Sequence, residues 1–196
     1  MIFNTDYYWG SPAKLFHWVA AALILFLYFH GLVAVEVEHE GKPAAASGWQ
    51  VGVHAGLGLV LGALMLARYL WRLINKIPML PVRTPEWEKR IAGLAHIGLY
   101  IATLLTILPG LLTASLARPD VSLFGVLRLP RVDALDTEFV REIASKVHET
   151  AAHALIFLVM VHVLAALHHH FVQRDSVLKR MLLRGRSRTR NERARK

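Results

Sequence analysis

The chain is 196 residues long, 55% hydrophobic, with a mean hydropathy of +0.39 and a formal net charge of +9. Such an apolar composition excludes an ordinary soluble protein and predicts a single membrane domain with four spans of about 20 residues each. The absence of cysteine excludes disulfides, thiolate zinc sites, iron–sulfur clusters and covalently attached c-type haem. Any metal must therefore be held by carboxylates or by some of the eleven histidines, whose imidazoles suit iron, copper and zinc.

The first two apolar runs predict a pair of membrane helices. Residues 15–35 are long enough to cross the hydrocarbon core and exceed the apolar part of a signal peptide, so we expect a retained helix. The connection over residues 36–48 is acidic and is predicted to face away from the cytoplasm. The second span, residues 49–71, has glycines at spacings that permit close approach of another helix, a flat cofactor or a second copy of the chain, and equally serve packing within one chain. These glycines are Gly52, Gly56, Gly58 and Gly62.

The second half of the chain predicts another pair of spans. Residues 91–114 follow a basic, proline-containing connection that we expect on the cytoplasmic side, and Pro109 with Gly110 predicts a kink near the far end of this helix. The apolar pattern of residues 133–146 predicts a short surface helix. It leads into the fourth span, residues 147–171.

The tail over residues 174–196 contains ten Lys or Arg residues and only two acidic ones, Asp175 and Glu192. A nucleic-acid-binding arm is the alternative interpretation. Directly after a hydrophobic helix, however, so basic a segment indicates a cytoplasmic end that fixes the topology and contacts anionic lipid. We therefore predict an all-α, up-down-up-down four-helix membrane bundle with both termini in the cytoplasm and no nucleic-acid partner.

Two histidines of the fourth span, His148 and His162, are fourteen residues apart. At 3.6 residues per turn they lie on one face, roughly 21 Å apart along the axis. His17 on the first span and His54 on the second differ in depth by roughly 17 Å when each is measured from the basic end of its helix. We therefore expect His17 to face His162 on the cytoplasmic side and His54 to face His148 on the opposite side. Because ionisable groups within a membrane tend to mark function, these pairs predict two stacked haems with histidines as axial iron ligands.

The remaining histidines are weaker candidates for ligands. His30 and His153 lie about 140° away from the faces of the paired histidines, so we expect His30 at the interface and His153 facing lipid or another helix. For His96, at the depth of the cytoplasmic pair, a hydrogen-bonding or quinone-side role is favoured over ligation. His169 is placed to meet haem propionates or a quinone headgroup, and a solvated helix end explains it equally well.

Five arginines are candidates for contacts with haem propionates, which need cations near the aqueous boundary. Arg68 and Arg72 are placed for the cytoplasmic haem, although the positive-inside rule alone also predicts them there. Arg118, Arg128 and Arg131 are placed for the other haem, where they would also attract an anionic electron donor.

Several motifs occur in a fixed order along the chain: LFHW (15–18), GVHAGLG (52–58), ARYLWR (67–72), GLAHIGLY (93–100), KVHET (146–150), MVHVLAALHHHF (160–171) and RDSVLKRM (174–181). By these motifs nearly the whole chain resembles the bacterial cytochrome b-561 family of four-helix, two-haem membrane proteins. Carried over by position, the resemblance assigns the haem ligands to His17, His54, His148 and His162.

The resemblance further implies two b-type haems in the bacterial inner membrane and electron transfer to or from quinone. One member type oxidises superoxide at the periplasmic face and reduces ubiquinone, so superoxide:quinone oxidoreductase activity is one expectation. With both axial positions filled by histidine we expect an electron carrier that links a small or protein donor to the quinone pool. One alternative is a membrane anchor cytochrome b subunit that relays electrons for a partner dehydrogenase or hydrogenase. Another is a small transporter or proton channel without haem, in which the paired histidine levels serve no obvious need.

Overall fold

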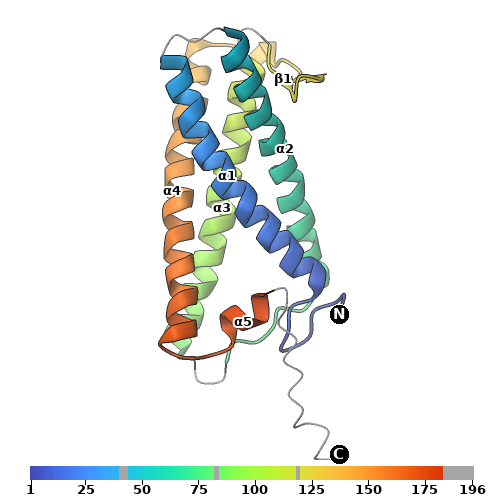
Figure 1. The fold of residues 1–196 in the computed structure, drawn as a ribbon, viewed down its shortest axis with the longest axis vertical. Coiled ribbons are helices and arrows are strands. Elements are labelled where there is room, and N and C mark those ends of the chain that lie inside the picture. Colours follow the sequence, from blue (N-terminus) through green and yellow to red (C-terminus); the bar gives the residue numbers. More distant parts are fainter. Residues whose placement is uncertain (40–43, 82–83, 118–119, 183–196) are drawn as a thin grey trace, which may run out of the picture.

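In a computed structural model the chain forms a bundle of four long helices that run alternately up and down, with the N-terminus and the last described residues at the same end (Figure 1). The structure describes residues 1–39, 44–81, 84–117 and 120–182. The four helices are α1 (Ser11–His39), α2 (Ala44–Ile74), α3 (Glu86–Leu116) and α4 (Glu138–Phe171). The predicted all-α four-helix membrane architecture is confirmed.

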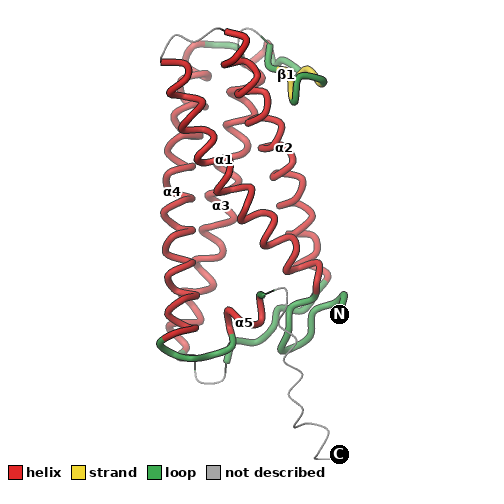
Figure 2. Tube along the Cα trace, viewed as in Figure 1, coloured by secondary structure: helices red, strands yellow, loops and turns green. Residues whose placement is uncertain are grey.

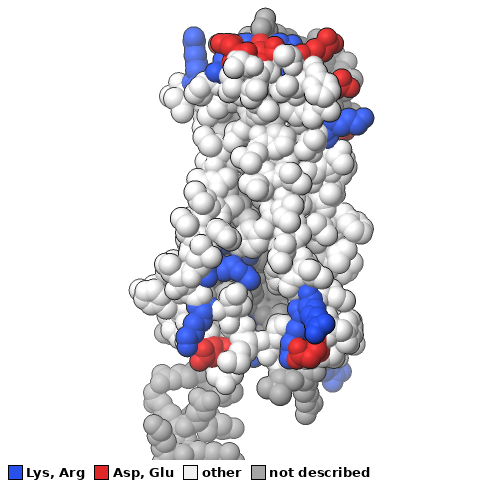
Figure 3. All heavy atoms as spheres, turned by 180° about the vertical axis from the view of Figure 1, so that it is seen from behind, with Lys and Arg blue, Asp and Glu red and all other residues white. Residues whose placement is uncertain are grey.

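All four helices are long and apolar enough to cross a membrane. In Figure 3 the charged side chains gather at the two ends of the molecule, and most of the surface between them carries no charge. Many large apolar side chains along the helices are exposed on this surface, as expected where lipid tails replace water. The candidate spans are Ser11–Val33, Gly48–Ile74, Glu86–Leu116 and Glu138–Phe171.

The start of α4 differs from the prediction of a separate surface helix over residues 133–146. Asp133–Leu135 forms only a short 3₁₀ helix, and α4 begins at Glu138. Thr137 fixes this start, because its side-chain oxygen accepts a hydrogen bond of 3.2 Å from the amide of Val140. The amphipathic residues that follow are therefore the first turns of α4 itself, which the sequence pattern alone does not distinguish from a separate helix.

Two other connections differ in length or content from the prediction. α1 and α2 extend into the acidic connection predicted over residues 36–48, so that only residues 40–43 separate them. After α4 the chain turns back and forms a short helix, α5 (Val177–Met181). The remainder of the predicted basic tail, residues 183–196, lies outside the described residues.

The helices associate as two helical hairpins, because α1 packs mainly against α2 and α3 packs mainly against α4. One apolar cluster joins the first hairpin to α3 and contains Ala20 and Leu27 of α1, Leu61 of α2 and the adjoining Ile107 of α3. Within the described residues, neither of the two apolar clusters includes a residue of α4. The contact of α4 with α1 and α2 is therefore made by other groups.

A two-stranded antiparallel hairpin lies at the end of the bundle opposite the termini (Figure 2); its strands are β1 (Ser122–Leu123) and β2 (Leu127–Arg128). Two glycines of α2 make room for it. A Cβ atom at Gly52 would lie 2.2 Å from the carbonyl oxygen of Ser122, and one at Gly56 would lie 2.7 Å from the ring of Phe124. These two glycines therefore receive the hairpin rather than a helix or a flat cofactor.

Candidate functional site

Six histidines form two groups at different depths in the bundle. The lower level, nearer the termini, contains His17 of α1, His96 of α3 and His162 of α4. The ring centroids of His17 and His162 are 6.2 Å apart, with 61° between the ring planes. The ring of His96 lies against His162 as well, with 5.5 Å between centroids. The lower level thus brings together the two histidines predicted to face each other and adds a third.

The upper level contains His30 of α1, His54 of α2 and His148 of α4. The centroids of His54 and His148 are 6.0 Å apart, with 84° between the ring planes. His30, which was predicted at the interface, lies beside His54 with 5.7 Å between centroids. Because α1 crosses the bundle obliquely (Figure 1), different faces of this helix meet the other helices at different depths. A comparison of angles along one straight helix does not capture this tilt.

The centroid separations provide a test of axial ligation. With a metal–nitrogen bond of about 2.0 Å and roughly 1.1 Å from that nitrogen to the ring centre, two imidazoles on opposite sides of one metal ion have centroids about 6.2 Å apart. The pairs that α4 forms with α1 and α2, at 6.2 and 6.0 Å, fit this separation. The contacts made by His96 and His30, at 5.5 and 5.7 Å, are shorter than this separation.

The ring nitrogens of these histidines give a second test. The Nδ1 atom of His148 lies 2.7 Å from the backbone carbonyl oxygen of Thr106. Since a carbonyl only accepts, this Nδ1 carries the hydrogen, and Nε2 keeps the lone pair that a metal needs. The Nδ1 atoms of His17, His30 and His54 are buried without a hydrogen-bond partner among the described residues. Leaving a buried ring nitrogen without a partner is costly, so these positions call for a group that is not part of the protein chain.

The arrangement does not resemble a site for a bare metal ion. In the part of the chain that the structure describes, no three His, Cys, Asp or Glu side chains converge to hold a metal. A zinc site takes three or four side chains. Two opposed imidazoles at each level instead fit a planar group that supplies its own in-plane ligands, such as haem.

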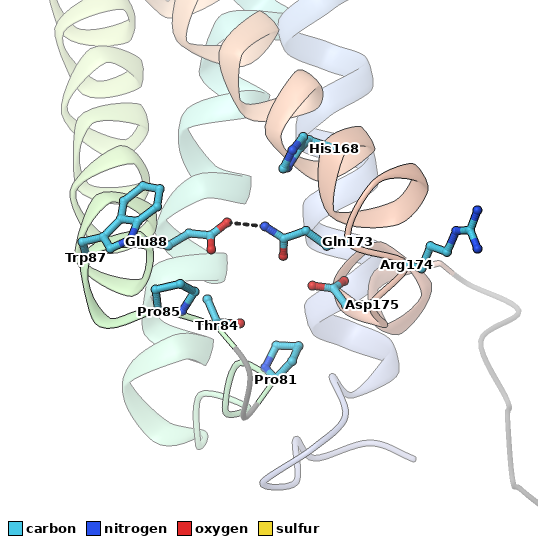
Figure 4. Close-up of a pocket in the computed structure, with 9 residues that line it drawn as sticks. All are labelled: Pro81, Thr84, Pro85, Trp87, Glu88, His168, Gln173, Arg174 and Asp175. Atoms are coloured by element: carbon cyan, nitrogen blue, oxygen red, sulfur yellow. Dashed lines mark hydrogen bonds between the residues drawn. The ribbon is translucent and has the colours of Figure 1, made fainter.

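A cavity of about 630 Å³ opens at the end of the bundle that holds the termini (Figure 4). It lies between the start of α3 and the segment after α4, and residues from both line it: Pro81, Thr84, Pro85, Trp87, Glu88, His168, Gln173, Arg174 and Asp175.

Beside this cavity His169 is held between two carboxylates. Its Nε2 lies 3.2 Å from Glu88 Oε1, and its Nδ1 lies 2.6 Å from Asp175 Oδ2. The amide of Gln173 donates a hydrogen bond of 2.8 Å to the same Glu88 oxygen. All three ionisable side chains are largely buried, so His169 belongs to an organised polar cluster rather than to a solvated helix end.

The arginines near the lower level differ in their contacts. The guanidinium carbon of Arg68 lies 5.8 Å from the centre of the Tyr100 ring. Its charge acts on both His17 and His162. Arg72 lies one turn further along, in the last turn of α2. Both arginines therefore lie near the lower histidines, Arg68 close to His17 and His162 and both of them close to His96.

At the opposite end Arg131 is bound by three carboxylates. It pairs with Asp120 at 3.0 Å, Asp133 at 3.1 Å and Asp136 at 3.0 Å. The hydrogen bond to Asp120 is the largest of several contacts that raise the pKa of Arg131 above its ordinary value. Arg131 is therefore committed to holding the loop before α4 and does not offer a free positive charge.

Two other arginines were predicted at this end. Arg128 is exposed on β2. Arg118 lies outside the described residues.

Comparison with known proteins identifies the family of the chain. The sequence profile of the prokaryotic cytochrome b561 family matches residues 8–184. The chain belongs to this family. The resemblance found in the sequence motifs is thereby confirmed.

Relatives of this cytochrome b561 include proteins of similar length. Cytochrome b561 homolog 2 of Escherichia coli K12 is 28% identical over 183 residues, which cover 91% of this chain and 93% of that protein. Cytochrome b561 homolog 1 of the same organism is 30% identical over 131 residues, covering 67% and 73%. A Yersinia pestis protein named probable superoxide oxidase CybB is 29% identical over 170 residues, covering 85% and 90%.

Family membership and the four apolar helices together establish the general function. This cytochrome b561 is a multi-pass bacterial membrane protein of electron transfer, and its family implies a haem b cofactor.

Proposed function

We propose that this cytochrome b561 holds two b haems, one between His17 and His162 and one between His54 and His148. The proposal rests on the 6.2 and 6.0 Å separations of these pairs, which suit ligands on opposite sides of one iron. Bound there, each haem supplies one-electron chemistry, with no open iron position for oxygen binding. The protein then moves electrons between a periplasmic donor and the quinone pool.

The histidines, the apolar surface and Arg68 have different functions in this proposal. The histidines hold the two sites at separate depths, and the exposed apolar surface of the bundle keeps them within the membrane. Arg68 places a positive charge near the lower pair and therefore favours an added electron there.

We place the end with the termini in the cytoplasm and the membrane as the bacterial inner membrane. Lys and Arg predominate in the tail and in the connection between α2 and α3, as the positive-inside rule requires. Acidic side chains gather at the opposite end (Figure 3). Asp120, Asp133 and Asp136 are among the acidic residues of that end.

The cavity near the termini is the proposed quinone site. Reduction of a quinone to a quinol consumes two electrons and two protons, so the site needs proton donors close to the electron source. The cluster of Glu88, His169 and Asp175 is a set of acid–base side chains beside the cavity. His169 follows His162 by seven residues, about 10 Å along the axis, which places the cavity next to the lower pair.

The donor is proposed to be a small molecule at the periplasmic face, with superoxide as the specific candidate. Loss of one electron converts superoxide to dioxygen without a proton, so the donor end needs no acid or base. The relative named as a probable superoxide oxidase supports this choice. The ion pairs of Arg131 count against guidance of an anion by that residue.

The test is a reduced-minus-oxidised absorption spectrum of purified protein, with extracted haem quantified per chain. We expect two non-covalent haems with low-spin b-type bands, and loss of one haem in each of His54→Ala and His162→Ala. His153→Ala is the matched control, because that exposed ring lies outside both histidine levels: it bonds to the carbonyl of Glu149 on its own helix at 2.8 Å and packs against Tyr28. Absence of a haem band from folded protein made with ample haem would refute the proposal.

A separate assay tests the donor. Purified protein that reduces quinone with superoxide alone supports the small-donor proposal. Activity that requires a copurifying dehydrogenase or hydrogenase subunit would instead favour the anchor function.

A further inference from the structure

The ring of His148 lies in a notch of α3 that exists because residue 110 is glycine. A Cβ atom at Gly110 would lie 2.5 Å from Nδ1 and 2.6 Å from Cε1 of that ring. Real Cβ atoms do not approach other atoms so closely, so any side chain at this position must displace the imidazole. The notch therefore fixes where the ring can lie.

The backbone of the same helix turn fixes which nitrogen carries the hydrogen. The carbonyl oxygen of Thr106 accepts the hydrogen bond from His148 Nδ1, over 2.7 Å. The hydroxyl of Thr106 is engaged elsewhere, because it donates to the carbonyl of Ala102 at 2.8 Å. The contact with His148 thus comes from the main chain, and the threonine side chain is dispensable for it.

Pro109 lies in the same helical turn and loosens it, although the carbonyl that it leaves without an amide partner belongs to Leu105 and not to Thr106. Proline has no amide hydrogen, so the carbonyl of Leu105 loses its usual partner, and the proline ring crowds the preceding turn. That turn contains Thr106, four residues before Gly110. Pro109, Gly110 and the Thr106 carbonyl form one local unit, in which the loosened turn presents an acceptor and the glycine leaves space for the donor.

We propose that Gly110 and the Thr106 carbonyl are positioning groups for His148 that lower the midpoint potential of the upper haem relative to the lower one. This inference rests on the proposed ligand role of His148. A hydrogen bond from the distal ring nitrogen makes an imidazole ligand more basic, which favours oxidised iron. Arg68 favours the reduced state at the lower pair. Electrons entering at the periplasmic side therefore run downhill toward the cavity near the termini.

The glycines of the bundle provide a graded set of variants. A Cβ at Gly110 meets the His148 ring at 2.5 Å, and one at Gly31 meets His54 Cε1 at 3.2 Å. At Gly98, also on α3, a Cβ meets only a methyl group of Leu158 at 3.8 Å, an ordinary contact. Alanine should therefore perturb the upper pair strongly at Gly110, weakly at Gly31 and not at all at Gly98.

The experiment is a redox titration of purified holoprotein followed by optical and electron paramagnetic resonance spectra. Gly110→Ala is expected to raise the potential of one haem component and to change its low-spin signal, or to release that haem alone. Gly31→Ala should change the same component less, and Gly98→Ala should match the wild type. Thr106→Val, which keeps the carbonyl, should keep the wild-type potential. Unchanged potentials and signals in Gly110→Ala with both haems bound would overturn the proposal.

A second measurement covers the case in which Gly110→Ala does not accumulate. Wild-type protein carrying ¹³C at its threonine carbonyls is compared with unlabelled protein by reduced-minus-oxidised infrared spectroscopy. We expect a label-sensitive carbonyl band that disappears in Thr106→Val, whose carbonyl at that position is unlabelled. The proposal is wrong if the wild type shows no such band.

His148→Ala separates this inference from the proposed function. Retention of both haems in that variant contradicts the ligand assignment itself. Loss of the haem component that Gly110→Ala alters supports both proposals. Loss of one haem in His148→Ala, combined with wild-type behaviour of Gly110→Ala, contradicts only the positioning role.

Discussion

The upper and lower histidine levels use the same kind of side chain but surround it differently. At the upper level the main chain acts: the Thr106 carbonyl binds His148, and Gly110 leaves room for its ring. At the lower level a charge acts, because Arg68 lies near His17 and His162. The difference shows that the ligands alone do not determine the properties of a site. A hydrogen bond to a ligand lowers the midpoint potential of a haem, whereas a nearby cation raises it, so two similar histidine pairs can have different potentials.

The largest effects are expected from variants that remove a proposed ligand from one histidine level at a time. In His162→Ala we expect reduction of quinone to fall to background, while the upper haem still accepts an electron from the donor. In His148→Ala the lower haem should remain reducible from quinol but not from the periplasmic donor. Stopped-flow spectra with each reductant measure this. Equal loss of both reactions in both variants would mean that the levels do not act in series.

A smaller effect is expected at the proposed quinone site. Glu88→Gln removes a carboxylate that contacts His169 but leaves both histidine levels intact. Quinol formation should fall on the order of 10²-fold, as for loss of a proton-transferring group, with haem content unchanged. Glu86→Gln is the control, because Glu86 is exposed on the same helix and pairs with Lys89 at 2.6 Å. Equal rates of quinol formation in the two variants would show that the cluster around His169 does not take part in proton transfer.

The charge at the lower level gives a still smaller effect. Arg68→Gln should lower the potential of the lower haem by roughly tens of millivolts, because a nearby positive charge favours the reduced state. The upper component should change less. Lys76→Gln, at an exposed residue that pairs with Asp6 at 3.1 Å, is the control in the same titration. A shift of equal size in both components would contradict a local action of Arg68.

The smallest effect is expected at the periplasmic end. Arg131→Gln would leave the carboxylates of Asp120, Asp133 and Asp136 without this cation, so the surface at this end of the bundle becomes more negative. Reduction by an anionic donor should slow a few-fold at low ionic strength and recover in high salt, while a neutral donor is unaffected. Second-order rate constants over a salt series test this. An unchanged rate constant with the anion would show that the ion pairs of Arg131 serve only the loop.

Much of the architecture follows from the sequence because regular helices have a fixed rise and because charge marks their ends. The relative depths of His17, His54, His148 and His162 could be predicted in this way, whereas their role as ligands remains a proposal. The place of His30 could not, since it depends on the tilt of α1 (Figure 1).

Contacts between segments that are far apart in the chain could not be predicted from the sequence pattern either. His169 and Glu88 are far apart in the chain, and only the packing of α3 against the end of α4 brings them together. The hairpin of β1 and β2 was missed because its strands are two residues long. Its nearest signal was the glycine spacing of α2, which is compatible with several partners.

The seat of the hairpin on Gly52 and Gly56 bears on how the protein is assembled. Synthesis delivers α1 and α2 first, and α3 and α4 as a second pair. Each proposed haem needs one histidine from the first pair and one from α4, so neither site exists until the pairs dock. The hairpin belongs to the second pair and rests on the first, and it can align the two before any cofactor arrives. Biogenesis would then proceed from docking to haem capture, with bound haem stabilising an arrangement already made.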